Sequence, residues 1–285
     1  MGRGAFGRVY KAVDSQTGQC VAIKMVAMNR FKSDHKQSIT FEIDLLKKLD
    51  HQNIVKYVDT VNSGHSLCII LEFIEGGSLE YLIKKFGCFS ETLVAIYIKQ
   101  VLRGLEYLHR QGVIHRDIKG GNILTTRDGV VKLADFGVAT KLTDAEKSNS
   151  FAGTPYWMAP EVIETSGRAT PACDIWSVGC TVYELLKGRP PNFECVNAFA
   201  AMSKIVKEEI TLPDGISAEL KDFLRLCFTK DPEFRPDAKS LLQHPWLKKE
   251  FDKSKLTRIL AQKLPQEVTN TIKIHLGEKK QSSDG

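Results

Sequence analysis

The spacing of apolar and polar residues divides the chain into a strand-rich first part and a helix-rich second part. In the first part, short segments of alternating β-branched and polar residues predict strands at 7–13, 19–26, 53–61 and 66–73. The first two are joined by DSQTG, residues 14–18, whose Asp, Ser and Gly suit a hairpin turn. One helix is predicted over 33–50, because apolar residues recur there at helical spacing.

Helical spacing dominates from Ser78 onward. It predicts helices at 79–86, 91–112, 174–188 and 218–228, with an extended, turn-rich section between Val113 and about Glu161. These elements predict an α+β fold with two lobes, a small β-rich N-lobe with one helix and a larger, mainly helical C-lobe. We assign the chain to an N-lobe, a hinge, a C-lobe and a C-terminal helical extension with a polar tail, at residues 1–71, 72–77, 78–250 and 251–285. A cleft between two lobes is a favoured place for a ligand.

Composition and charge argue against several classes of protein. The net charge is +6, but acidic and basic residues are interleaved, and the sequence has no concentrated Lys/Arg face with aromatic residues that would predict nucleic-acid binding. The seven cysteines are scattered without a C-x-x-C pair, so we interpret them as buried thiols in a reducing compartment. No apolar run approaches the roughly 20 residues of a membrane span, and no signal sequence is recognisable. We therefore expect a cytoplasmic protein that does not bind a membrane.

The segment GRGAFGRV fits the phosphate-binding pattern G-x-G-x-x-G with Gly2, Gly4 and Gly7. Dinucleotide-binding folds share this spacing, but their glycines lead from a strand into a helix, whereas the residues after Gly7 predict a second strand. The pattern favours a strand-to-strand flap over phosphate, and a plain glycine-rich hairpin is the alternative. Lys24 lies among apolar neighbours in the next strand and needs an anion there. Glu42 on the following helix and a nucleotide phosphate would both serve, unless Lys24 simply faces outward.

Two further segments carry polar residues that are costly to bury without partners, HRDIKGGN at 115–122 and LADFG at 133–137. Together with GTPYWMAPE at 153–161 and DIWSVGC at 174–180, they resemble the eukaryotic protein kinases over nearly the whole chain. The amino-acid sequence of these motifs is most similar to the sterile (MAP kinase kinase kinase-like) group, especially the septation-initiation and mitotic-exit kinases and the plant MAP kinase kinase kinase epsilon type. The resemblance implies a bilobal kinase fold. It also implies an ATP-dependent serine/threonine protein kinase in a signalling cascade related to cell division or MAP kinases.

The resemblance assigns roles to the polar residues of these segments. Asp117 would receive or orient the hydroxyl proton of a protein substrate, and Lys119 would neutralise the transferring phosphate. Asn122 and Asp135 would hold Mg²⁺, which prefers oxygen ligands. Thr154 is similar to the threonine that contacts the Asp/Lys pair in Ser/Thr-specific kinases. These residue types suit phosphoryl transfer because that reaction is limited by charge and alignment.

The resemblance also implies a nucleotide site. Lys24, paired with Glu42, would lie at the ATP phosphates. Hinge backbone from Glu72 to Ile74 would recognise adenine, and three apolar residues would enclose the ring: Val9, Ala22 and Leu124.

Other residues of the motifs are expected to be structural. His115 would belong to the apolar core, together with Phe136, Leu46 and Tyr57. Glu161 and Arg235 would form a buried ion pair, and Asp174 would brace the backbone of the catalytic loop.

The section before Thr154 also predicts regulation. Ser148 and Ser150 lie in a polar stretch, and a phosphate on Ser150, added by an upstream kinase or by autophosphorylation, could pair with Arg116. Arginine-directed relatives carry acids where this chain has Ser78 and Gly121. A strong requirement for Arg upstream of the acceptor is thus not expected, although other surface acids could substitute.

One departure leaves a second interpretation open. Because the chain opens at the glycine loop, we expect most of the strand before that loop to be missing, so the first strand of the N-lobe would be truncated. A kinase-like scaffold or nucleotide-binding module without turnover is therefore the alternative. Such proteins usually lose Lys24, Asp117 or Asp135, and none of these is lost here.

Overall fold

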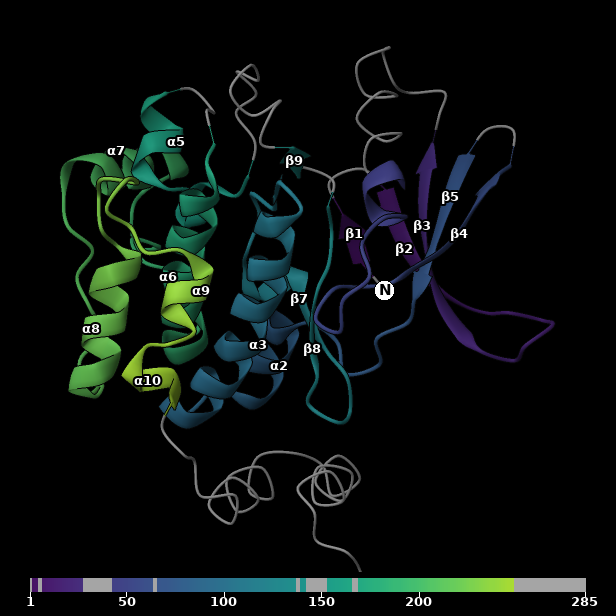
Figure 1. Ribbon diagram of the computed structural model, residues 1–285, viewed down its shortest axis with the longest axis horizontal. Helices are drawn as coiled ribbons and strands as arrows, with labels where there is room; N and C mark the ends of the chain where they lie inside the picture. The colour runs from purple at the N-terminus through teal and green to yellow at the C-terminus, as the bar shows by residue number, and fades with distance from the viewer. Residues whose placement is uncertain are drawn as a thin grey trace, which may run out of the picture.

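The structure is a computed structural model, which describes residues 2–4, 7–27, 43–63, 66–136, 139–141, 153–165 and 169–248. A β-sheet from the N-terminal part of the chain lies beside a larger, helical region from the rest (Figure 1). The predicted α+β fold with two lobes is confirmed. The boundaries of the lobes, the hinge and the extension stay predictions, and residues 251–285 lie outside the described part of the chain.

The N-lobe sheet has five antiparallel strands in the order β1-β2-β3-β5-β4: β1 Gly2–Gly4, β2 Gly7–Val13, β3 Cys20–Ala27, β4 Tyr57–Asn62 and β5 Ser66–Glu72. Strands β2, β3 and β5 match the prediction to within one residue at each end. The predicted hairpin turn between β2 and β3 is confirmed, since the Gly18 amide donates to the Asp14 carbonyl at 2.8 Å. Gly18 has a φ of 71°, a left-handed conformation that glycine adopts without strain.

The predicted strand over 53–61 is wrong at its start, because β4 begins only at Tyr57. Asn53 bonds to the C-lobe instead: its side-chain amide donates to the Val131 carbonyl at 2.8 Å, and its carbonyl accepts from the Leu133 amide at 2.9 Å. Of the predicted helix over 33–50, residues 43–46 are helical, and residues 28–42 lie outside the described part.

The C-lobe is mainly helical. Its helices are α2 Leu79–Phe86, α3 Glu91–Arg110, α5 Pro160–Glu164, α6 Pro171–Lys187, α7 Ala198–Lys207, α8 Ala218–Cys227, α9 Ala238–Leu241 and α10 Pro245–Lys248. Serine side chains cap the first turns of α2, α3 and α8, where the helix amides need acceptors: Ser78, Ser90 and Ser217. The long helices α3 and α6 pack against each other, and each has more buried residues than any other helix that the structure describes.

Short strands join the helices in the predicted extended section. They are β6 Val113–Ile114, β7 Ile123–Thr125, β8 Val131–Leu133 and β9 Thr140–Lys141, which form the antiparallel pairs β6-β9 and β7-β8. The hinge is held against β7, since the Thr125 amide donates to the Gly77 carbonyl at 2.9 Å. One continuous apolar core includes residues of both lobes, among them Val26 and Ile69 of the sheet and Leu105 of α3.

The prediction of buried cysteines is correct for only part of the set. Cys173, Cys180 and Cys227 are buried, and burial raises the pKa of each thiol. Cys20 and Cys88 are exposed, because Cys20 lies at the hairpin end of β3 and Cys88 in the loop after α2. Among the described residues, no helix is both long enough and apolar enough to span a membrane.

Candidate active site

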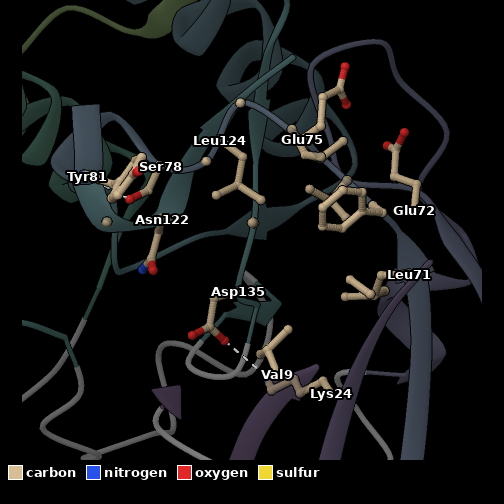
Figure 2. Close-up of a pocket in the computed structure, with 18 of the residues that line it drawn as sticks. Val9, Lys24, Leu71, Glu72, Glu75, Ser78, Tyr81, Asn122, Leu124 and Asp135 are labelled. Carbon is tan, nitrogen blue, oxygen red and sulfur yellow. Dashed lines mark hydrogen bonds and ion pairs between the residues drawn. The ribbon is translucent and has the colours of Figure 1, made fainter. Parts of the chain in front are cut away.

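A cavity of about 580 Å³ lies where the N-lobe sheet meets the C-lobe (Figure 2). Six residues predicted to bind nucleotide line it: Val9, Ala22, Lys24, Glu72, Ile74 and Leu124. The glycines of the G-x-G-x-x-G pattern lie in the β1-β2 hairpin, where Gly4 pairs with Gly7 and Gly2 pairs with Val9. The pattern is therefore a strand-to-strand hairpin as predicted, and Val9 connects that hairpin to the cavity.

Lys24 and Asp135 meet inside this cavity. Lys24 projects from β3 with only 4% of its surface exposed, and its Nζ donates to Asp135 Oδ1 at 3.0 Å. Asp135 follows β8 with a φ of 61°, an unusual conformation for a non-glycine residue. The structure therefore brings together side chains 111 residues apart and provides the anion that a buried lysine needs. Glu42, the other predicted partner of Lys24, lies outside the described residues.

A second polar cluster surrounds Asp117. Lys119 Nζ donates to Asp117 Oδ2 at 2.8 Å and to Thr154 Oγ1 at 2.5 Å, and the Thr154 hydroxyl donates to Asp117 Oδ1 at 2.6 Å. Asn122 Nδ2 donates to Asp117 Oδ2 at 2.7 Å and to the Asp117 carbonyl at 2.9 Å. Both carboxylate oxygens of Asp117 thus accept fixed hydrogen bonds, which orients the group. The predicted contact of Thr154 with the Asp/Lys pair is present.

Asp174, at the start of α6, holds the backbone just before Asp117. Its Oδ2 accepts from the His115 amide at 2.9 Å, and its Oδ1 accepts from the Arg116 amide at 2.8 Å. Its Oδ2 also lies 2.8 Å from His109 Nε2. Burial by itself would raise the pKa of Asp174, but the hydrogen bonds and charges of His109 and His115 together lower it. The predicted bracing by Asp174 is confirmed.

The structure also confirms the other structural predictions. His115 is fully buried, and its ring centroid lies 5.1 Å from that of Phe136. Leu46 belongs to the apolar core cluster that contains Phe136, and the partly buried Tyr57 packs against that cluster. Arg235 and Glu161 form a two-point ion pair with N–O distances of 2.7 and 3.0 Å.

The structure describes only some of the predicted regulatory residues. Ser148 and Ser150 lie outside the described residues, so the prediction of a phosphate contact stays a prediction. Arg116 is buried, with a left-handed φ of 69°, and burial lowers the pKa of its guanidinium. Its position directly before Asp117 places its backbone next to the Asp117 cluster.

Asn122 and Asp135 fit a hard divalent cation. Both line the cavity and carry oxygen donors of the kind that Mg²⁺ prefers. The amide nitrogen of Asn122 is used in its bonds to Asp117, so its carbonyl oxygen remains for a cation. Figure 2 shows both side chains projecting into the cavity.

Sequence reasoning missed several residues of the site. Tyr81 lines the cavity from the first turn of α2, and the Ser78 cap could have indicated that this turn begins beside the hinge. Glu184 of α6 is only 4% exposed, and its Oε2 accepts from the Gly120 amide at 2.9 Å and from Trp157 Nε1 at 3.2 Å. Burial raises the pKa of Glu184 to about 7. No local spacing could have indicated the contact, because Gly120 and Glu184 are 64 residues apart.

The family model and the similar proteins all point to protein kinases. The family model described as "Protein kinase domain" matches residues 1–247. MAP3K epsilon protein kinase 1 of Arabidopsis thaliana is 56% identical over 252 residues, which cover 87% of this chain and 18% of that protein. The cytokinesis protein sepH of Emericella nidulans is 56% identical over 248 residues, with 87% and 18% coverage. Cell division control protein 7 of Schizosaccharomyces pombe is 54% identical over 248 residues, with 87% and 23% coverage.

The chain thus spans less than a quarter of the length of these relatives. The match covers all the elements that form the cavity and the Asp117 cluster. By the family match, the resemblance in its motifs and the shared identity, the chain belongs to the protein kinase family.

Proposed function

We propose that this chain transfers the γ-phosphoryl group of ATP to serine or threonine hydroxyls of protein substrates. The observation that carries the proposal is a charged pair inside the cavity that Asn122 links to a second charged pair outside its lining. Lys24 and Asp135 meet in the cavity at 3.0 Å, and Lys119 contacts Asp117 at 2.8 Å. Asn122 joins them, since it lines the cavity and also bonds to Asp117. A site for phosphoryl transfer needs such positioned charges more than it needs covalent chemistry.

ATP would bind with its adenine between the lobes. Hinge backbone at Glu72 to Ile74 would bond to the base, and Val9, Ala22 and Leu124 would enclose the ring. Lys24 would lie at the phosphates. Asn122 and Asp135 would hold Mg²⁺, which when bound neutralises phosphate charge.

Asp117 would orient the acceptor hydroxyl and take its proton. The hydroxyl oxygen then bonds to the γ-phosphorus as the bond to the β,γ-bridging oxygen breaks, which leaves ADP. Lys119 supports this step because its ammonium lies beside the carboxylate and stabilises negative charge that moves onto the transferred group. Thr154 keeps the pair aligned through its bonds to both residues.

We also propose a role in a signalling cascade, with another protein, such as a downstream kinase, as substrate and with a cytoplasmic location. The relatives' names support this role, since they refer to a MAP3K, to cytokinesis and to cell division control. Activation by phosphorylation at Ser150, with Arg116 as the phosphate's partner, belongs to the same proposal. Its support is the position of Arg116 directly before Asp117.

The test compares phosphate transfer by the wild type and by Asp117→Asn. Purified protein is incubated with Mg-ATP and a generic Ser/Thr acceptor such as myelin basic protein, and phosphorylated sites are identified by mass spectrometry. We expect transfer by the wild type and a loss of at least about 100-fold in Asp117→Asn. Asp128→Asn, which changes an exposed aspartate in the β7-β8 turn, is the matched control and should keep full activity.

The alternative, a kinase-like module without turnover, gives a different result. It would bind ATP but transfer no phosphate in either protein. Equal transfer by the wild type and by Asp117→Asn would remove the catalytic assignment.

A further inference from the structure

A second cavity, with a volume of about 680 Å³, lies in the C-lobe away from the candidate active site. It is formed by α8, by the segment that joins α7 to α8, and by the residues that directly follow α8. In Figure 1, α7 and α8 lie at the end of the molecule opposite the N-lobe sheet. The two cavities share no lining residue, so the roles proposed above leave this one without a function.

Three basic side chains line this cavity. Lys221 and Arg225 lie four residues apart on α8 and therefore project from the same side of the helix, and Lys230 follows the helix. Within the described part of the chain, none of the three forms an ion pair with a carboxylate. Like charges one helical turn apart repel each other, so the arrangement on α8 favours an anion that binds between them.

The ammonium group of Lys230 is held in place by α7. Its Nζ donates to the carbonyls of Ile205 and Val206, the second at 2.9 Å. Both carbonyls belong to the last turn of α7, where a helix leaves its C=O groups without partners. An ammonium group has three donors, and among the described residues two of them have a partner. Burial lowers the pKa of Lys230, because the positive charge is costly to keep there without an anion.

The negative charges of the cavity come from a different element. Glu209 and Asp214 are exposed, and both belong to the segment between α7 and α8, whereas the basic residues belong to α8 and the chain just after it. The cavity is therefore positive at α8 and negative at the segment. A bound anion should lie on the α8 side, where the basic groups are.

The other residues of the cavity suit a peptide better than a free anion. The Phe228 ring packs edge-on against Trp176, with ring centroids 5.1 Å apart, which gives the cavity a fixed apolar wall. Ile210 and Leu212 line the cavity from the α7-α8 segment, and in the part of the chain that is described their amides and carbonyls form no hydrogen bond. A peptide offers amides, carbonyls and apolar side chains to such a surface, whereas inorganic phosphate offers none of these.

We propose that this cavity binds an acidic segment of a partner protein, in which an Asp or Glu side chain pairs with Lys221 and Arg225 and a neighbouring apolar side chain packs against Phe228. The guanidinium of Arg225 suits a carboxylate because the two groups can form parallel hydrogen bonds. The inference goes beyond the proposed function, because no residue of the candidate active site takes part. A protein bound here leaves the cavity between the lobes open.

Synthetic peptides are the probes for this site. An array presents one acidic and one apolar residue at different spacings in an alanine host, and matched peptides carry Gln or Lys in place of the acid. The full chain, fluorescently labelled, is bound to the array, and the best acidic peptide is then titrated by fluorescence anisotropy. For the wild type we expect a dissociation constant at least about 10-fold lower than that of the Gln peptide, with a smaller difference at high salt.

Charge-reversal variants locate the site. Lys221→Glu and Arg225→Glu should each weaken binding of the acidic peptide about 10-fold, and the double variant should prefer the Lys peptide. Lys221 is partly exposed and Arg225 is exposed, so these variants should fold, which circular dichroism checks. Arg189→Glu reverses an exposed charge of the same lobe that does not line the cavity. It is the matched control and should leave the dissociation constant unchanged.

Three results would overturn this inference. They are an array without a preference for acidic over Gln peptides, a preference that survives both charge reversals on α8, and displacement of the peptide by inorganic phosphate at a concentration where sulfate has no effect. The last result would make the cavity a phosphate site. Asp117→Asn should bind the acidic peptide as the wild type does, since the measurement involves no phosphoryl transfer. Failure of the proposed kinase activity would therefore leave the peptide site intact, and weaker binding by Asp117→Asn would place the peptide in the active site instead.

Discussion

Replacing Asp174 by Asn should destabilise the chain strongly, because the carboxylate satisfies three donors inside the protein. Asp174 is fully buried, and its two oxygens lie 2.8 to 2.9 Å from the amides of His115 and Arg116 and from His109 Nε2. Asparagine has one acceptor oxygen, so its NH₂ group would face a donor. A hydrogen bond to a charged group contributes about 1.5 to 3 kcal/mol, and a buried donor left without an acceptor costs a similar amount. We expect Asp174→Asn to lower the free energy of unfolding by about 2 to 4 kcal/mol.

The same substitution should lower kcat. The His115 and Arg116 amides fix the backbone that leads into Asp117, so loss of their acceptor loosens the carboxylate that we propose as catalytic. Asp174 does not line the nucleotide cavity, so KM for ATP should change little. Urea unfolding followed by tryptophan fluorescence measures the free energy. A thermal scan should show a melting temperature about 5 to 15 °C lower.

Asp222→Asn is the matched control for this prediction. Asp222 also pairs with a histidine, His244, at 3.1 Å, but its side chain is 66% exposed. Removing an exposed pair should change the free energy of unfolding by less than about 1 kcal/mol. If Asp174→Asn and Asp222→Asn lose the same small amount of stability, the bracing role assigned to Asp174 is incorrect.

Three further predictions concern the loop, the pair at Asp117 and the hinge. The raised pKa of Glu184, about 7 against 4.5, means that the folded state holds a proton which the unfolded state has lost. The free energy of unfolding of the wild type should thus fall by up to about 3 kcal/mol between pH 4.5 and 7, relative to that of Glu184→Gln. If the free energies of unfolding of the two proteins change with pH in parallel, this prediction is wrong. Thr154→Val should lower kcat about tenfold while Thr154→Ser keeps it, since only the hydroxyl bonds to Asp117; equal steady-state kcat values would argue against that role. Gly76→Ala would place a Cβ atom 2.2 Å from the Thr125 carbonyl oxygen and should cost about 1 to 3 kcal/mol, seen as a lower melting temperature.

The sequence predicted those strands whose residues alternate along their whole length. Strands β2, β3 and β5 match the predicted ranges to within one residue, because successive side chains of a strand point to opposite faces, so that apolar and polar residues alternate along it. The start of β4 could not be predicted in this way. Asn53 lies in the same alternating stretch, but its side chain and carbonyl bond to β8, more than 70 residues away, and this draws the chain out of the sheet.

The active-site residues also fall into those that the sequence predicted and those that it could not predict. Motif spacing predicted Asp117, Asn122 and Asp135, since these residues lie in short sequence motifs that are typical of kinases. It could not predict Glu184. The place of Glu184 beside the catalytic loop follows from how α6 packs against the turn at Gly120–Asn122, and such packing leaves no signature in local spacing.

Helix α6 explains how a loop rich in polar groups keeps a fixed shape inside the protein. Asp174 in its first turn accepts from the amides of His115 and Arg116, and Glu184 near its end accepts from the amide of Gly120. Ten residues of helix span about 15 Å, so two carboxylates on one buried helix anchor the loop on both sides of Asp117. Because the helix is rigid, the distance between the two anchors is set before any substrate binds. The position of the Asp117 carboxylate therefore depends on α6 as well as on its own polar partners, and the cost of burying these polar groups is offset by bonds that also hold Asp117 in place.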